Sequence, residues 1–129
     1  MINGPIALTN FGTIIDCINN SNIRFREPLT STGAAGIVID NYGLVKNCIN
    51  TGSPYISGRI AGIVHHNYET GIIDGCINLG TISHDHTPTL SGIVSRNSGL
   101  VTNCINYGLI INTSGPTNRY AYGICGYNN

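Results

Sequence analysis

Apolar residues occur in short runs of three to six along the whole chain, and glycine or asparagine separates one run from the next. The runs are rich in Ile and Val, which is typical of β-strands bounded by turns. No stretch sustains the apolar period of an α-helix, and the frequent glycines disfavour one. The pattern therefore predicts an all-β protein with almost no helix.

The runs belong to a repeat that contains Cys-Ile-Asn four times, with its cysteines 31, 28 and 28 residues apart. A Gly-Ile-Val-like triplet, an asparagine, a glycine and an aliphatic pair precede each cysteine. The first copy departs from the pattern, because Pro5 replaces the opening glycine and Asn19-Asn20-Ser21 replaces the closing turn. A fixed period marks a stacked repeat protein, in which each copy buries its apolar face against the next.

Three short strands in a repeat of 28–31 residues describe one coil of a parallel β-solenoid (β-helix). Equivalent positions of successive coils then stack at a strand spacing of roughly 4.8 Å. We expect one solenoid domain over residues 1–129, with about four coils. The expected repeats are about 5–35, 36–61, 62–91 and 92–122, followed by a partial fifth rung at 123–129.

Four of the five cysteines, Cys17, Cys48, Cys76 and Cys104, occupy the same repeat position. An odd total argues against a disulfide framework, and stacked equivalents point the same way, which is poor geometry for a bridge. We expect a ladder of small buried side chains with free thiols. A disulfide or a metal site is the alternative, although no Cys-x-x-Cys pair supports zinc.

The residue before each of these cysteines is of a type that tolerates left-handed backbone. These residues are Asp16, Asn47, Gly75 and Asn103. If the chain turns a corner at this point, Val45 and Cys48 both face the core and the isoleucine after the cysteine faces outward. If the strand alternates strictly, that isoleucine lies on the same face as Val45 and Cys48 lies on the other. The sequence leaves both arrangements open for Ile18, Ile49, Ile77 and Ile105. An outward apolar stripe would be a candidate contact surface.

Asparagine also recurs at a fixed place after each triplet, as Asn10, Asn41, Asn67, Asn97 and Asn128. Stacked amides hydrogen-bond from one coil to the next and satisfy buried turns. We therefore expect a structural ladder, with a sugar- or ion-binding role as the alternative.

Composition and charge narrow the function. The 129 residues are 41% hydrophobic and 9% charged with a net charge of zero, which suits a single compact domain. The six basic residues are dispersed, so they leave no electrostatic footprint for nucleic acid or an anionic membrane. No apolar run is long enough to span a membrane, and residues 1–5 lack the regions of a signal peptide. We expect neither nucleic-acid binding nor membrane insertion.

Candidate catalytic chemistry is sparse. All four histidines lie in the third repeat, where His84-Asp85-His86 offers two imidazoles on one strand face or, beside Thr87-Pro88, forms a loop. Asp16 and Asp74 are two repeats apart, or roughly 10 Å by strand spacing, which is wider than the usual carboxylate pair of a glycosidase. We expect no enzymatic activity, no cofactor and no metal site.

Four variable segments separate the repeats, at residues 20–35, 52–61, 83–91 and 112–122. Such insertions gather on one side of a solenoid and carry specificity. They either anchor a partner or shield the coil through residues that include Arg24-Phe25-Arg26, Tyr55, Arg119-Tyr120 and Tyr122. A separate aromatic row, Phe11, Tyr42 and Tyr68, follows the recurring asparagine until Ser98 interrupts it. This row raises the hypothesis of a glycan-binding module.

The pattern Gly-Ile-Val-x-x-Asn-x-Gly-x-Ile/Val-x-x-Cys-x-Asn-x-Gly, as in residues 92–108, resembles the GLUG-type repeat. That repeat occurs in large secreted and surface proteins of bacteria, including adhesin-like proteins and some immunoglobulin-A peptidases. The resemblance covers nearly the whole chain. It implies a β-solenoid stalk that is accessory rather than catalytic, and an extracellular or cell-surface location.

The main functional hypothesis is a noncatalytic structural or adhesive module that is part of a larger surface protein. The competing hypothesis is self-assembly into an extracellular filament, because an uncapped solenoid exposes unpaired backbone and core at both ends. Head-to-tail contacts would propagate by joining the first coil, through Ile6 and Leu8, to the last rung, through Ile124, Cys125 and Tyr127.

Overall fold

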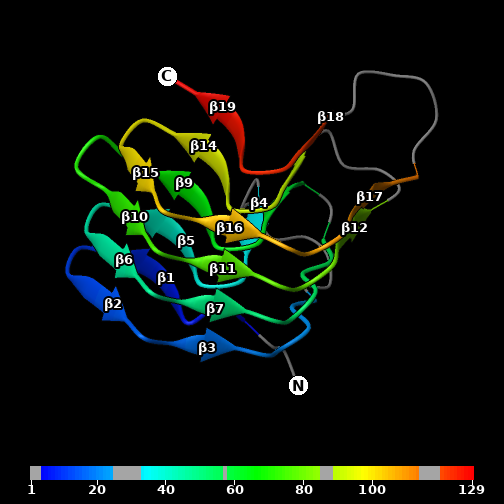
Figure 1. The fold of residues 1–129 in the computed structure, drawn as a ribbon, viewed down its shortest axis with the longest axis horizontal. Coiled ribbons are helices and arrows are strands. Elements are labelled where there is room, and N and C mark those ends of the chain that lie inside the picture. The colour runs from blue at the N-terminus through cyan, green and yellow to red at the C-terminus, as the bar shows by residue number, and fades with distance from the viewer. Residues whose placement is uncertain (1–3, 25–32, 57, 85–88, 114–119) are drawn as a thin grey trace.

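The computed structural model describes residues 4–24, 33–56, 58–84, 89–113 and 120–129. Throughout these ranges the regular structure consists of strands that pair in parallel, and no helix occurs in them. Each strand lies beside its equivalent from the neighbouring repeat, so that the coils stack along one axis (Figure 1). The predicted all-β parallel β-solenoid of about four turns is confirmed.

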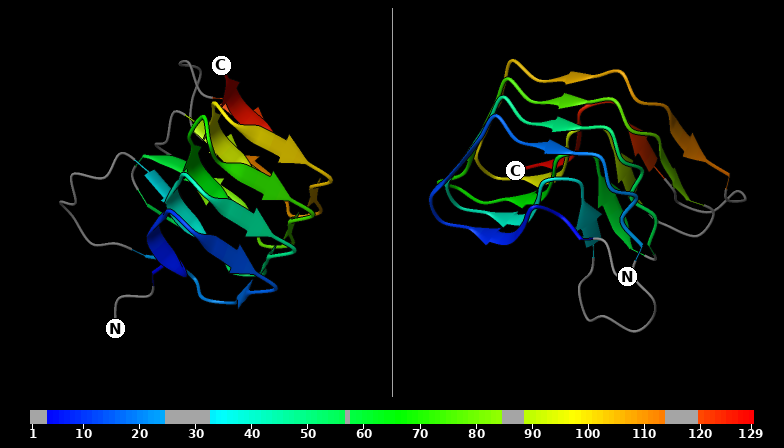
Figure 2. Two further views of the ribbon diagram at one scale, coloured as in Figure 1. Left: turned by 90° about the vertical axis from the view of Figure 1, so that its left-hand side faces the viewer. Right: turned by 90° about the horizontal axis from the view of Figure 1, so that it is seen from below.

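Five parallel sheets run along the axis (Figure 2). We number them 1 to 5 in the order in which the chain passes through them within a coil. Sheet 1 contains β1 (Ala7–Asn10), β5 (Val38–Asn41), β9 (Val64–Asn67), β14 (Val94–Asn97) and β19 (Cys125–Asn128). Sheet 2 contains β2 (Thr13–Ile15), β6 (Leu44–Lys46), β10 (Ile72–Asp74) and β15 (Leu100–Thr102). Sheet 3 contains β3 (Ile18–Asn19), β7 (Ile49–Asn50), β11 (Ile77–Asn78) and β16 (Ile105–Asn106). Sheet 4 contains β12 (Ile82–His84) and β17 (Ile110–Asn112). Sheet 5 contains β4 (Gly33–Ala35), β8 (Arg59–Ala61), β13 (Thr89–Ser91) and β18 (Tyr120–Tyr122).

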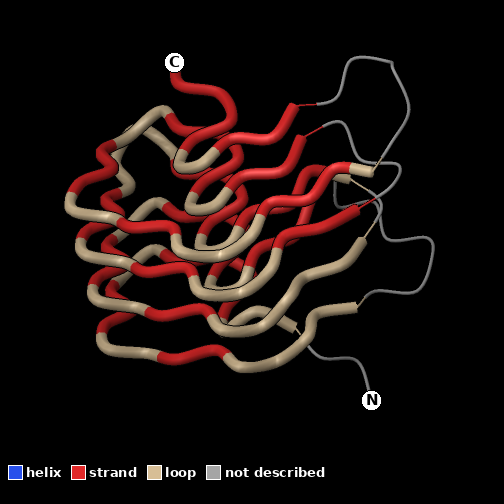
Figure 3. Tube along the Cα trace, turned by 45° about the vertical axis from the view of Figure 1, so that its right-hand side comes forward, coloured by secondary structure: helices blue, strands red, loops and turns tan. Residues whose placement is uncertain are grey.

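The prediction of three strands per coil is wrong, because the coil that runs from β8 to β12 has five strands. One reason is the corner before each cysteine, which splits a single apolar run into a strand of sheet 2 and a strand of sheet 3 (Figure 3). The other reason is sheet 5, whose strands lie in segments that the sequence marks as variable. Residues such as Gly33 and Ala34 have weak strand preference, and their pairing with Arg59 and Ile60 supplies the order.

The corner has a left-handed backbone. Asp16, Asn47 and Asn103 have φ angles of 55°, 51° and 53°, and Gly75 takes the same place with a φ of 64°. Asparagine, aspartate and glycine tolerate this region better than other residues.

This corner settles which way the neighbouring side chains point. Val45 and Cys48 are both buried in the main core, together with Ile73 and Cys76. The isoleucines after the cysteines face outward, and Ile18 is 64% exposed at the first coil. They pair directly from coil to coil, as Ile18 with Ile49, Ile49 with Ile77, and Ile77 with Ile105. The outward stripe that the sequence left open is therefore present.

Two cores and one small apolar cluster, made of Ala35, Ile39 and Ala61, fill the solenoid. The main core lies between sheet 1 and sheets 2 and 3, and its buried members are Ile37, Val38, Val45, Cys48, Ile63, Val64, Ile73, Cys76, Ile93 and Val94. A second core joins sheets 5 and 4 through Ala34, Ile56, Ile60, Ile82 and Leu90. All five cysteines are free thiols, and Cys17, Cys104 and Cys125 pack against the main core.

The recurring asparagines form a continuous ladder through the interior. Each Nδ2 donates to the Oδ1 of the next coil, at 2.8 Å from Asn10 to Asn41, from Asn41 to Asn67 and from Asn67 to Asn97, and at 2.7 Å from Asn97 to Asn128. The ladder has a direction, because every amide donates toward the C-terminal end. Buried amides that are paired in this way avoid the cost of lost hydration.

A second asparagine ladder joins Asn50 to Asn78 and Asn78 to Asn106, both at 2.8 Å. These asparagines are the ones that follow Cys-Ile in the repeat. The ladder does not extend to the first coil, where Asn19 Nδ2 donates to the Gly36 carbonyl. The buried Asn50 Oδ1 has no partner in the part of the chain that the structure describes. The irregular sequence Asn19-Asn20-Ser21 thus corresponds to a real break in the stacking.

Candidate functional site

The residues predicted for an end-to-end interface lie at the two opposite ends of the solenoid (Figure 1). Ile6 and Leu8 are exposed at the first coil, where β1 is an edge strand of sheet 1. Ile124 and Tyr127 are exposed at the other end, where β19 is the opposite edge strand, and Cys125 is partly buried. Both ends therefore present unpaired strand edges beside apolar side chains.

The two ends are not simple complements of each other. Sheet 1 has five strands, whereas sheets 2 and 3 have four each. If β1 of a second copy paired with β19, its β2 and β3 would lie two rungs beyond β15 and β16. One strand position in each of sheets 2 and 3 would remain empty, so direct stacking of copies continues sheet 1 alone.

The aromatic row forms a stack along the solenoid axis. The ring centroids of Phe11 and Tyr42 are 4.9 Å apart with planes at 16°, and those of Tyr42 and Tyr68 are 4.0 Å apart at 11°. His66 covers Tyr68 at 3.8 Å. A hydrogen bond with Tyr42 raises the pKa of Tyr68 to about 12. The rings of this row cover one another's inner faces, while Phe11 at the end of the row is 78% exposed.

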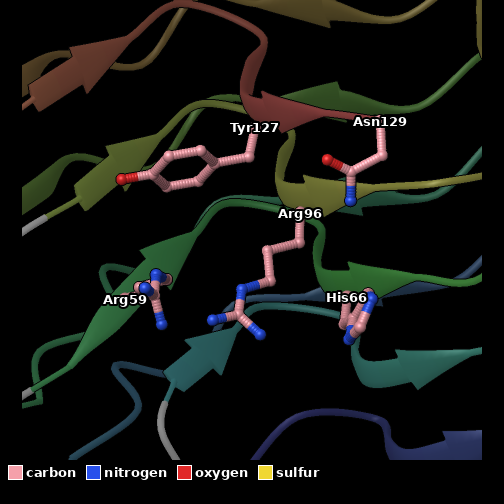
Figure 4. A pocket seen from close by; sticks show the side chains of 5 residues that line it. All are labelled: Arg59, His66, Arg96, Tyr127 and Asn129. Atoms are coloured by element: carbon pink, nitrogen blue, oxygen red, sulfur yellow. The ribbon is translucent and has the colours of Figure 1, made fainter.

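A hollow of about 310 Å³ lies where sheets 5 and 1 meet, and Arg59, His66, Arg96, Tyr127 and Asn129 line it (Figure 4). Arg59 comes from β8, His66 from β9, Arg96 from β14 and Tyr127 from β19. His66 pairs with Arg96 and Arg96 with Tyr127 in the register of sheet 1, so three successive coils build one wall. The Arg59 guanidinium lies 5.7 Å from the centroid of the Tyr127 ring.

The hollow is electropositive. Its lining contains two guanidinium groups and no side-chain carboxylate, and the ion pair found among the described residues, Lys46 with Asp74 at 3.1 Å, belongs to sheet 2. Asp40 is the acidic residue of the same row, one coil before His66. Burial, and then the charge of Arg96, lowers the pKa of His66, while Asp40 opposes that shift. The positive charge at neutral pH therefore comes from the arginines.

Polar side chains without partners gather behind this hollow. His65 is only 5% exposed, and neither ring nitrogen has a hydrogen-bond partner among the described residues. Thr89, Ser91 and Ser95 have buried hydroxyls in the same condition, and so does the buried Nε of Arg59. Burial, followed by the nearby charges of His66, Arg96 and Arg59, lowers the pKa of His65 to about 4. The imidazole is therefore neutral at pH 7.

Acid is expected to destabilise the protein through His65. Between pH 6.5 and pH 4 the unfolded chain binds a proton that the folded imidazole does not, so the free energy of unfolding falls as the pH falls. The total loss is about 3 kcal/mol, and this histidine contributes no pH dependence above its unfolded pKa. Urea unfolding followed by circular dichroism at a series of pH values measures the effect.

The matched variant is His65→Ile, because Ile39 occupies the equivalent position one coil earlier, where Val38 pairs with Val64. In this variant most of the fall in the free energy of unfolding between pH 6.5 and pH 4 should disappear, whereas His66→Gln should keep it. If the free energy of unfolding of His65→Ile still fell by the same amount over this pH range, another group would be the cause of the acid sensitivity.

The other candidate chemical residues are dispersed. Asp74 is paired with Lys46 and accepts a hydrogen bond from Asn103, and Asp16 lies at the corner of the first coil. His84 is buried and its ring packs against Tyr55 at 4.6 Å, and Arg24 lies over the same tyrosine. Asp85, His86, Phe25, Arg26 and Arg119 lie outside the described residues. Within the described ranges, no three His, Cys, Asp or Glu side chains are grouped as a metal site, and no helix is long and apolar enough to cross a membrane.

Comparison of the chain with protein-family models, with curated proteins and with solved structures finds no match in any of the three.

Proposed function

We propose that this chain is a noncatalytic structural or adhesive module of a secreted or cell-surface protein, and that its solenoid body holds other segments at a fixed distance. One observation carries the proposal: the residues that recur in the sequence are engaged in contacts between coils. The asparagines bond to one another, and the cysteines pack in or against the main core. Pattern residues engaged in this way are not available for chemistry, and the surface location rests on the resemblance of the repeat.

The open ends favour continuation by further coils. Unpaired edges of parallel strands beside apolar side chains pair with other chains and promote aggregation unless another segment covers them. A coil laid on β15 and β16 in continuation of β19 would fill the empty positions of sheets 2 and 3, which a second copy placed on β19 does not. Other coils of a larger protein therefore fit the end better than stacked copies do.

Filament formation is the second candidate, and the direction of the first asparagine ladder favours it. The Nδ2 of Asn128 is left to donate and the Oδ1 of Asn10 is left to accept from another chain, so head-to-tail contact suits the ladder and head-to-head contact does not. Such heterologous contacts propagate without closing.

An extended chain separates the two candidates. Residues 99–128 are duplicated after Asn129, which continues the repeat in register at the C-terminal end. The module proposal expects a higher urea midpoint for the extended chain, because the added coil covers the exposed end of both cores. The module proposal also expects the molar mass of the original chain, measured by light scattering, to change little with concentration. An unchanged midpoint would contradict the proposal.

The filament candidate expects the opposite behaviour of the original chain. Its mass would rise with concentration, and the exposed-end variants Leu8→Lys and Tyr127→Lys would each suppress that rise. Lys46→Glu, a charge change on the side of the solenoid, is the control that leaves association unaffected. Growth that persists in both end variants would rule out stacking through these edges.

A further inference from the structure

The hollow between sheets 5 and 1 has the composition of a binding site for an anion. Two arginines converge on it from different sheets, with Arg96 extending between Arg59 and His66 in Figure 4. Neither guanidinium takes part in an ion pair with a described carboxylate. Arginine residues placed together without acid partners repel one another, and an oxyanion in the hollow relieves that repulsion.

The other lining residues indicate which further chemical groups the ligand carries. Tyr127 is 40% exposed and contributes an aromatic ring, and Asn129 contributes a side-chain amide to the same wall. A ring and an amide beside two guanidinium groups suit a polar molecule with an apolar face, hydroxyl groups and one carboxylate. The volume of about 310 Å³ is at the small end of ligand pockets, so it suits a single ring rather than an extended chain.

We infer that this hollow binds an acidic monosaccharide unit, such as a hexuronate, with its carboxylate between Arg59 and Arg96 and its ring against Tyr127. The planar carboxylate accepts paired hydrogen bonds from a guanidinium fork, a geometry that lysine does not provide. Asn129 lies within the same hollow to meet the hydroxyl groups of the sugar. This assignment stands apart from the structural role proposed above, because none of the lining residues belongs to either core.

The repeat pattern does not explain these residues, which supports a role other than stacking. The position of Arg96 is occupied by Asp40 and His66 in the two preceding coils and by Tyr127 in the following one. The position of Arg59 is occupied by Gly33 in the preceding coil. The two arginines thus come from neighbouring coils, Arg59 from β8 and Arg96 from the coil of β13 and β14, and both line the same hollow.

Titration of the full chain with sodium glucuronate, followed by amide chemical shifts in NMR, tests the assignment. Saturable shifts are expected at Arg96, Tyr127 and Asn129, and glucose at the same concentrations should leave them unmoved. Arg96→Gln and Arg59→Gln should each weaken binding by roughly tenfold or more, because each removes a charge-assisted pair of hydrogen bonds. Lys46→Gln, which removes a cation on sheet 2, should bind as the original chain does.

Several outcomes would overturn the inference. These are the absence of saturable shifts with glucuronate, equal binding of glucose, or unchanged binding in both arginine variants. If acetate bound as tightly as glucuronate, the carboxylate alone would account for binding, and the assignment of a sugar ligand would be wrong. The spectra report folding directly, and if an arginine variant unfolds, Tyr127→Ala at the exposed edge provides the second test through loss of the ring contact.

Discussion

Replacement of Gly62 by alanine is expected to unfold most of the protein at room temperature. A Cβ at this position would lie 2.1 Å from the carbonyl oxygen of Gly92 and 2.4 Å from Cγ of Asn78. The first of these atoms is backbone of the next coil, which is fixed by a strand spacing of roughly 4.8 Å and has no rotamer to relieve the contact. We expect a loss of more than about 4 kcal/mol, which is a large part of the stability of a domain of this size.

The chain contains its own control for this prediction. Gly123 opens the final repeat at the position equivalent to Gly62, but a Cβ on it meets no atom within 4 Å. Gly123→Ala should therefore shift the urea midpoint little. If Gly62→Ala and Gly123→Ala were equally destabilising, conformational freedom of glycine rather than the approach of the next coil would be the cause.

The second large effect is expected for Asn67→Ala, at the centre of the first asparagine ladder. Asn67 is fully buried, accepts from Asn41 and donates to Asn97 and to the Gly71 carbonyl at 3.1 Å. Its loss leaves a small cavity and removes these hydrogen bonds together with a longer one to the Leu100 carbonyl at 3.4 Å, so polar groups in two coils lose a partner where water does not replace it. We expect the free energy of unfolding to fall by about 3 kcal/mol.

Asn128→Ala is the matched control, because Asn128 ends the ladder and its side chain accepts a hydrogen bond from Asn97 alone among the described residues. It should cost less than about 1 kcal/mol, since its site is exposed and water compensates for the lost amide. Urea unfolding of both variants, followed by circular dichroism, measures the difference. Equal losses would mean that the ladder contributes no more in the interior than at the end.

Much of the fold was predictable from the sequence, because the constraint that forms the repeat is local in sequence and the same in every coil. A buried position must remain apolar or paired in each copy, so the cysteines and the first asparagine series mark the interior by their spacing. The number of strands was less predictable. The sequence does not distinguish an apolar run that continues from one that bends at Asn47 or Gly75, and only the φ angles of these residues show the break.

The candidate site was less accessible to sequence reasoning. Tyr127 was predicted to take part in an end-to-end interface, and Arg59 and Arg96 appeared only as dispersed charges. The signal that could have found them is a comparison of equivalent positions: the row Asp40, His66, Arg96 and Tyr127 changes charge from coil to coil, while the position after it is always asparagine. Such variation at one register position marks a surface that stacking does not determine.

The sequence by itself determined the period of the solenoid, its all-β character and the residues of its cysteine series and first asparagine ladder. The physical reason is that each coil can bury its apolar and amide groups only against an identical neighbour, which imposes the same residues at each turn. The tertiary structure decided which side of the coil the isoleucine stripe faces, and it brought Arg59 beside Arg96. Those outcomes depend on the backbone angle at the corners and on how sheets 5 and 1 meet, and no repeating residue pattern encodes that junction.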